Sequence, residues 1–101
     1  MSLAEKKLAV IFEFRDAEGH TRRREVTGQV AKALIALYEA GEHGCTALEV
    51  ATWAYRMASY VYDLRHEHGL QIRMDKEEHF GGWHARYVLV TVIVIVEIHE
   101  I

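Results

Sequence analysis

The sequence contains no proline and a single cysteine, Cys45, so neither Pro-rich linkers nor an internal disulfide organises the chain. An unpaired thiol is typical of proteins in the reducing cytoplasm, where we expect this one to act. The most apolar stretch, Tyr87 to Val96, is half as long as the roughly 20 residues of a membrane helix, so we expect no membrane span. The amino terminus lacks the apolar run of a signal peptide, and we expect no export.

A surplus of basic residues is also missing. The chain has 12 Lys and Arg against 15 Asp and Glu, which gives a formal charge of -3. Between His20 and Val90 there are nine residues of each sign, so the negative surplus lies in the terminal segments. This balance excludes a generally basic coat protein for nucleic acid, and any such contact must come from a local patch.

The composition that remains is that of one globular domain. Half of the 101 residues are apolar and 27% are charged. A chain of this size can bury a core without a metal or a disulfide, so we expect a single domain over residues 1–101.

The first 41 residues predict a hairpin and a helix. Residues 8–14 are strand formers, and the turn residues 16–19 separate them from a polar strand at 20–26. A helix is expected from Thr27, whose hydroxyl can cap it, to Ala40, because the next residue is a glycine suited to a helix C-terminus. The side chains expected to point inward are Val30, Leu34, Leu37 and Tyr38.

A capping box at residues 46–49 predicts a short second helix. The Thr46 hydroxyl and the Glu49 carboxylate can each accept the other residue's backbone N–H. This helix should bury Leu48 and Ala51 and bend near residue 52, and a third helix should follow and end at Gly69. The inward face of the third helix is predicted to hold Met57, Ala58, Val61, Leu64 and Arg65, and its outer face Arg56, Ser59, Tyr60 and Asp63.

After Gly69 the apolar period changes to two, which predicts a second hairpin. Its first strand should cover residues 70–75, its loop 76–84 and its return strand 85–101. As one strand, residues 87–98 would span about 40 Å, against a radius of gyration of about 13 Å for a 100-residue domain, so the strand must bend or project. The strand at residues 8–14 can pair along it.

Both faces of this return strand are apolar, so cover on one side cannot hide it. One face carries Val88, Val90, Val92, Val94 and Val96, and the other Leu89, Ile93 and Ile95. We expect the terminal strands, 8–26 and 87–101, to form a sheet that is buried against a second copy in a homodimer. The alternative is a monomer whose amino-terminal hairpin curls over the second face.

The order strand, strand, helix, short helix, helix, strand, wing and strand resembles a winged helix-turn-helix domain, an α+β fold, over residues 44–90. Ala51 matches the small residue where the two helices of such a motif approach, and Val61 and Leu64 match the apolar residues that seat the second helix. Tyr55 departs from the pattern, because the turn often carries glycine. The segments 44–49, 62–65, 69–72 and 81–89 are also similar to small winged-helix proteins of bacterial and prophage genomes.

This resemblance implies DNA binding, with the third helix in the major groove and the wing on the backbone or in the minor groove. Arg56 is expected to contact guanine, because its guanidinium can bond both acceptors of that base. The predicted DNA-binding residues are Tyr55, Arg56, Ser59, Tyr60, Arg73, Lys76, His84 and Arg86. Asp63 and the pair Glu77 and Glu78 would repel phosphates. On this hypothesis the protein is a small homodimeric transcription regulator.

The cluster Arg22 to Arg24 offers at most a two-residue patch, because alternation along a strand puts Arg22 and Arg24 on one face and Arg23 on the other. Its alternative role is that of a charged edge strand, which resists aggregation.

We expect neither an enzyme nor a cofactor, since the sequence has no Gly-rich phosphate loop, nucleophile elbow or catalytic triad. His66 and His68 are two residues apart, about 200° around a helix, and therefore cannot chelate one metal ion unless the helix ends between them. Cys45 precedes a helix start, where a thiol can become reactive, although a buried cysteine is the commoner outcome.

A second hypothesis keeps the fold and changes the partner. The domain would be a protein-interaction or assembly module whose aromatic side chains meet another protein. Those side chains are Trp53, Tyr55, Tyr60 and Trp83. The neutral charge of the winged unit favours this hypothesis, whereas the motif residues support only the fold.

Overall fold

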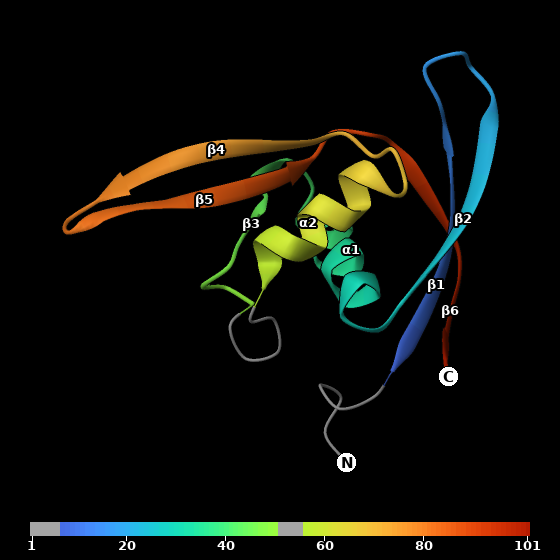
Figure 1. Cartoon of the computed structure of the whole chain (residues 1–101), viewed down its shortest axis with the longest axis horizontal. Helices are drawn as coiled ribbons and strands as arrows, with labels where there is room; N and C mark the ends of the chain where they lie inside the picture. The colour runs from blue at the N-terminus through green and yellow to red at the C-terminus, as the bar shows by residue number, and fades with distance from the viewer. Residues whose placement is uncertain (1–6, 51–55) are drawn as a thin grey trace.

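The computed structural model describes residues 7–50 and 56–101, in which two α-helices lie between two three-stranded sheets (Figure 1). The elements are β1 (Leu8–Arg15), β2 (Thr21–Thr27), α1 (Gly28–Ala40), the short 3-10 helix η2 (Gly41–His43), β3 (Cys45–Thr46), α2 (Met57–His66), β4 (Ile72–His79), β5 (Gly82–Leu89) and β6 (Ile93–Glu100). The α+β architecture expected from the sequence is confirmed.

The first sheet has the order β2-β1-β6, with both pairs antiparallel. The predicted amino-terminal hairpin is therefore present, and its turn is held by the Asp16 carboxylate, which accepts the backbone N–H groups of Glu18 and His20. Phe12 and Phe14 lie on the face that packs against the helices, and both are buried. The predicted pairing of the amino-terminal strand with the carboxyl-terminal one is also confirmed.

Helix α1 begins and ends where the sequence predicts, but its contacts differ in two respects. Thr27 precedes the first helical residue without a side-chain capping bond. Tyr38 is 46% exposed, whereas Ala31 and Ala33 are buried with Leu34 and Leu37. Small side chains such as these two alanines allow close packing of a helix against its neighbours, and Tyr38 lies outside this contact.

The capping box is confirmed. The Thr46 N–H donates to Glu49 Oε1 at 2.8 Å, and the Glu49 N–H donates to Thr46 Oγ1 at 3.2 Å. Residues 47–50 form turns, and residues 51–55, including Ala51 and Tyr55, lie outside the described residues. The expected burial of Leu48 is wrong: Leu48 is 82% exposed and Val50 is buried instead, because helical spacing does not apply to these turns.

We expect Thr46→Ala to lower the free energy of unfolding by about 1 kcal/mol, because it removes one of the two reciprocal capping bonds. The pKa of Glu49 is lowered, chiefly because the Thr46 backbone N–H donates to its carboxylate. Glu49 therefore contributes stability above its unfolded-state pKa, and this contribution is lost as the pH falls through the lowered folded-state value. Urea denaturation at neutral pH measures the change, with the exposed Leu48→Ala as the control, expected to change stability by less than about 0.5 kcal/mol.

Helix α2 ends at His66, three residues before the predicted end at Gly69, and Gly69 follows the turn that closes it. The Leu70 N–H donates to the Leu64 carbonyl at 3.1 Å, six residues back, and Gly69 has a φ of 73°. A left-handed residue just after a helix is most often glycine, as the sequence predicts for this position.

The carboxyl-terminal hairpin has longer paired strands and a shorter turn than predicted. Strands β4 and β5 pair from Ile72 with Leu89 to His79 with Gly82, so the turn consists of Phe80 and Gly81 alone. The predicted loop at 76–84 is therefore wrong, because cross-strand pairs extend the ladder through its charged residues. In Figure 1 this hairpin, which we call the wing, projects beyond the amino-terminal end of α2.

The predicted long return strand is two strands in two different sheets. Strand β5 ends at Leu89 and pairs with β4, whereas β6 begins at Ile93 and pairs with β1. Gln71 holds the corner between them: its carbonyl accepts the N–H groups of Val90 and Thr91, and its own N–H donates to Thr91 Oγ1 at 2.7 Å. Of the two expected outcomes, a bend or a projecting strand, the chain therefore bends, and the bend brings residues 93–100 back to the first sheet.

Candidate nucleic-acid interface

Helix α2 presents one face to the core and the opposite face to the solvent. Met57, Val61 and Leu64 are buried toward the core. Arg65 joins the helix to the wing, since its guanidinium donates two hydrogen bonds to the Ile72 carbonyl. The face opposite the buried one is therefore held in a fixed orientation relative to the wing.

The exposed face differs from the predicted one. Arg56 and Ser59 are exposed as expected, but Ala58, predicted to point inward, is exposed, and Tyr60 is half-buried against the core. Residue 60 lies three positions after Met57 and four before Leu64, so the helical repeat turns it toward the buried side. As DNA contacts, Arg56, Ser59 and Tyr60 stay predictions.

Tyr62 and His66 are exposed residues of this face that the sequence reasoning missed. Tyr62 is 60% exposed and stacks on His66, with ring centroids 4.1 Å apart. The signal was available, because an aromatic residue and a histidine four positions apart meet on a helix surface. The described exposed face of α2 is made by Ala58, Ser59, Tyr62 and His66, with Arg56 at its amino-terminal end.

The predicted cations of the wing each lie beside another side chain. Arg73 donates from Nε to the Asp75 carboxylate at 2.9 Å. The Lys76 ammonium lies over the ring of Trp83, 5.1 Å from its centroid. His84 Nε2 lies 2.8 Å from Glu77 Oε1. These contacts put a carboxylate or an aromatic ring where a phosphate would otherwise bind.

Arg86 connects the wing to the start of the helix-turn-helix segment. Its Nε donates to Glu77 Oε2 at 2.8 Å, and its Nη1 donates to the His43 carbonyl and to Glu49 Oε1, both at 3.3 Å. The bond to Glu77 raises the pKa of Arg86, and the bonds from Arg86 and His84 lower the pKa of Glu77. Arg86 thus fixes the wing against the capping box, and its side chain is only 19% exposed.

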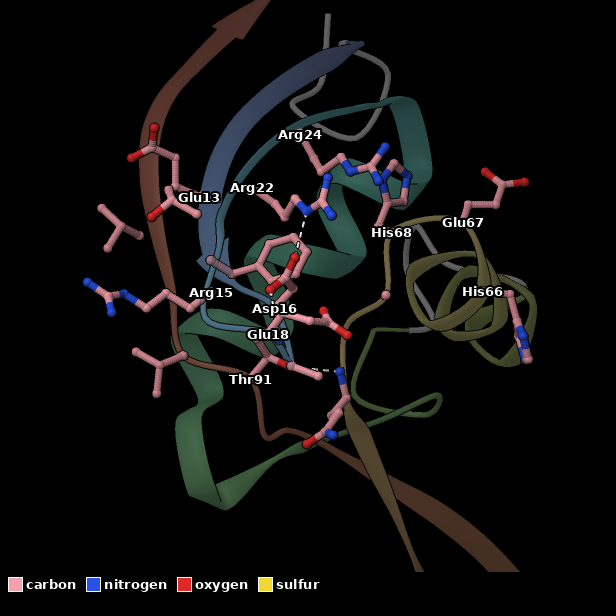
Figure 2. Close-up of a pocket in the computed structure, with 17 residues that line it drawn as sticks. Glu13, Arg15, Asp16, Glu18, Arg22, Arg24, His66, Glu67, His68 and Thr91 are labelled. Atoms are coloured by element: carbon pink, nitrogen blue, oxygen red, sulfur yellow. Dashed lines mark hydrogen bonds and ion pairs between the residues drawn. The ribbon is translucent and has the colours of Figure 1, made fainter.

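A cleft separates the amino-terminal hairpin from the end of α2 (Figure 2). Arg22 and Arg24 line it, whereas Arg23 is on the other face of the strand and pairs with Glu13 at 3.0 Å, as alternation predicts. Arg22 pairs with Asp16 at 2.7 Å. The cleft therefore carries both signs of charge.

The two histidines at the end of α2 do not converge on one point. His66 stacks on Tyr62, whereas His68 packs edge-on against Phe12 with ring centroids 6.2 Å apart. Burial lowers the pKa of His68 and thereby favours its neutral form. Among residues 7–50 and 56–101, no three His, Cys, Asp or Glu side chains form a group that could hold a metal ion.

Cys45 is a core residue. It lies in β3, paired with Tyr87 of β5, and is 5% exposed. Burial raises the pKa of its thiol, so at neutral pH it is protonated and weakly nucleophilic.

The exposed helix, the helix packed behind it and the adjoining two-stranded wing together define a winged helix-turn-helix domain. The family model described as a winged helix domain matches residues 23–99. The chain belongs to this family, whose domains are typically DNA-binding modules and generally not enzymes. No curated protein and no solved structure shows significant similarity to the chain.

Within the described ranges, no helix combines the length and the apolar character needed to cross a lipid bilayer.

Proposed function

We propose that the protein binds double-stranded DNA, with the exposed face of α2 in the major groove and the wing along the adjacent backbone or minor groove. The observation that carries the proposal is the exposed face of α2, held at a fixed angle to the wing by Arg65 and flanked by Arg56. A helix about 10 to 12 Å wide fits the major groove, which is about 12 Å wide.

Arg56 is the proposed base-reading residue. It is exposed at the amino-terminal end of α2, and its guanidinium can bond both acceptors of a guanine. Ser59 and Tyr62 follow it along the same exposed face, and we propose that they contact bases or phosphates. The contacts proposed from the sequence at Tyr55 and Tyr60 stay part of the proposal.

On the wing, we propose that Lys76 contacts a phosphate, because in the described structure its ammonium lies over the Trp83 ring and not beside a carboxylate. Arg73, His84 and Arg86 would have to exchange a carboxylate partner for a phosphate. With about two to four phosphate contacts per protomer, the logarithm of affinity should fall with the logarithm of salt at a slope of about -2 to -4. Binding to random DNA should therefore be weak at physiological salt.

The first test is fluorescence anisotropy with random duplexes and genomic fragments over a salt series. We expect Arg56→Ala to weaken binding to a preferred fragment by about 1 to 3 kcal/mol, or about 5- to 150-fold, and to reduce sequence preference. Arg23→Ala is the matched control: it removes an equal charge from the first sheet, where Arg23 is paired with Glu13. Equal losses in both variants, or no binding even at low salt, would contradict the proposal.

The regulator is proposed to act as a homodimer in the cytoplasm. Two copies double the phosphate contacts and place two α2 helices on neighbouring half-sites, which compensates for the weak electrostatics of one copy. The exposed apolar residues of β6, described below, are the reason to expect a second copy.

A protein-interaction module is the second candidate function, and the charge pairing in the wing favours it. The wing also exposes apolar side chains: Phe80 at its tip is fully exposed, Trp83 is 54% exposed and Met74 is 48% exposed. Such a surface suits a protein partner better than phosphates. Absence of DNA binding at low salt, together with a folded wild-type protein, would favour this candidate.

A further inference from the structure

The two edges of the sheet β2-β1-β6 differ in chemistry. The β2 edge carries three consecutive arginines, Arg22 to Arg24, which is a common way to prevent strand addition. The β6 edge, with the sequence IVIVEIHE, contains no lysine, arginine or proline. Within the described part of the chain, no strand pairs with this second edge.

Strand β6 leaves apolar side chains in the solvent. Val94 is 61% exposed, Val96 is 44% exposed and Ile98 is 49% exposed. Val94 lies on the same face as Glu13 and Ile98 on the same face as Val10, because the register with β1 shifts between Ile11 and Phe12. The exposed apolar side chains therefore lie on both faces beside the open edge, where a second protein chain would remove them from water. An unprotected edge of this kind invites pairing through the backbone as well.

The ladder with β1 shows which backbone groups of β6 point outward. The Ile101 N–H donates to the Lys7 carbonyl at 3.0 Å, so residue 101 faces β1. Because bonded and non-bonded positions alternate in an antiparallel ladder, His99 also faces β1, whereas Ile98 turns its backbone groups away from β1 to the other edge.

We propose that β6 pairs with β6 of a second copy of this chain, antiparallel and about a two-fold axis through Ile98. The result is a continuous six-stranded sheet in the order β2-β1-β6-β6-β1-β2. This inference rests on the homodimer of the proposed function and names its interface. It does not depend on which residues contact DNA.

Charge decides the register. Pairing centred on Ile98 sets Glu97 of each copy opposite His99 of the other. The two side chains already lie 3.6 Å apart within one chain, so two copies form a cluster in which carboxylates and imidazoles alternate. Pairing centred on Glu97 would instead set two carboxylates opposite each other, which is unfavourable, and pairing centred on His99 would set two imidazoles opposite each other and leave Glu97 without an opposite histidine.

The first test measures mass by light scattering and sedimentation. The wild-type chain should have twice the 11.6 kDa of one copy, and Ile98→Lys, which puts a charge at the two-fold axis, should be a monomer at the same concentration. Val92→Lys is the matched control: it also puts a lysine in place of an exposed apolar residue, but residue 92 lies outside the paired segment, so this variant should stay a dimer. A monomeric wild type, or a dimeric Ile98→Lys, would overturn the proposal.

A charge exchange tests the register without changing the apolar surface. His99→Glu sets two carboxylates opposite each other twice in the dimer and should weaken association about tenfold or more. The double variant Glu97→His with His99→Glu restores both opposite pairs and should recover the wild-type association constant. If the double variant stays as weak as His99→Glu, the register is wrong. Circular dichroism verifies that each variant is folded.

Anisotropy with DNA on the same samples separates the two proposals. A dimer that binds no DNA would contradict the proposed function and support this interface. A monomeric wild type that binds DNA would contradict this interface and support the proposed function.

Discussion

Replacement of Gly44 by alanine is expected to lower the free energy of unfolding by about 2 to 5 kcal/mol. Gly44 is buried between η2 and β3 and has a φ of 75°, a conformation that costs an L-residue about 1 to 2 kcal/mol. A Cβ atom there would lie 2.7 Å from the Tyr87 carbonyl oxygen and 2.8 Å from Val88 Cγ2. Since the first of these atoms belongs to the backbone of β5, the strand itself would have to move.

Gly19→Ala separates the two causes of this loss. Gly19 also has a positive φ, 84°, but a Cβ atom at that position meets no other atom within 4 Å. Its replacement should therefore cost only the conformational part, about 1 to 2 kcal/mol. Urea denaturation of both variants gives the comparison. Equal losses would mean that the close approach to β5 is not what requires glycine at position 44.

Leu64→Ala is the second substitution with a large expected effect, a loss of about 3 to 4 kcal/mol. Leu64 is fully buried on the core side of α2, and its carbonyl accepts the N–H of Leu70 that closes the helix. Truncation leaves a cavity at the contact of α2 with the core, where the rigid β-sheets on either side limit collapse.

The control for Leu64→Ala is Ser59→Ala on the exposed face of the same helix. It removes a small polar side chain and improves helix propensity, so stability should change by less than about 0.5 kcal/mol. If Ser59 contacts the duplex, Ser59→Ala should weaken DNA binding more than Leu64→Ala does, although it changes stability less. Denaturation of the two variants shows which side chain stabilises α2, and anisotropy shows which side chain contacts DNA.

The local elements of this protein were predictable because their signals are local. The hairpin at the amino terminus follows from strand formers around a turn, and the limits of α1 follow from Gly41. The capping box needs only Thr46 and Glu49, and its two bonds form as expected. Each of these features involves residues a few positions apart, where propensity and hydrogen-bonding geometry decide the outcome.

The candidate interface was only partly predictable. Arg56 and Ser59 were expected on the exposed face, but Tyr60 turns inward and Tyr62 takes the outer place. The wing cations look available in the sequence, whereas in the folded chain Asp75 of the same strand pairs with Arg73, and Glu77 pairs with Arg86 across the hairpin. Pairing across strands depends on register, which a two-residue turn at Phe80 and Gly81 sets and a predicted longer loop would not.

The sequence by itself determined most of the local elements and their order, because hydrophobic periodicity and turn residues specify them. That order resembles a winged helix domain, the family to which the chain belongs. Tertiary structure alone decided where the apolar run from Tyr87 to Val96 divides. Gln71 is distant in sequence from Thr91. Its carbonyl accepts the Thr91 N–H and its own N–H donates to Thr91 Oγ1, and these bonds hold the bend of the chain between the two sheets. That bend turns one long apolar strand into a wing strand and an open sheet edge, and only long-range packing can make such a choice.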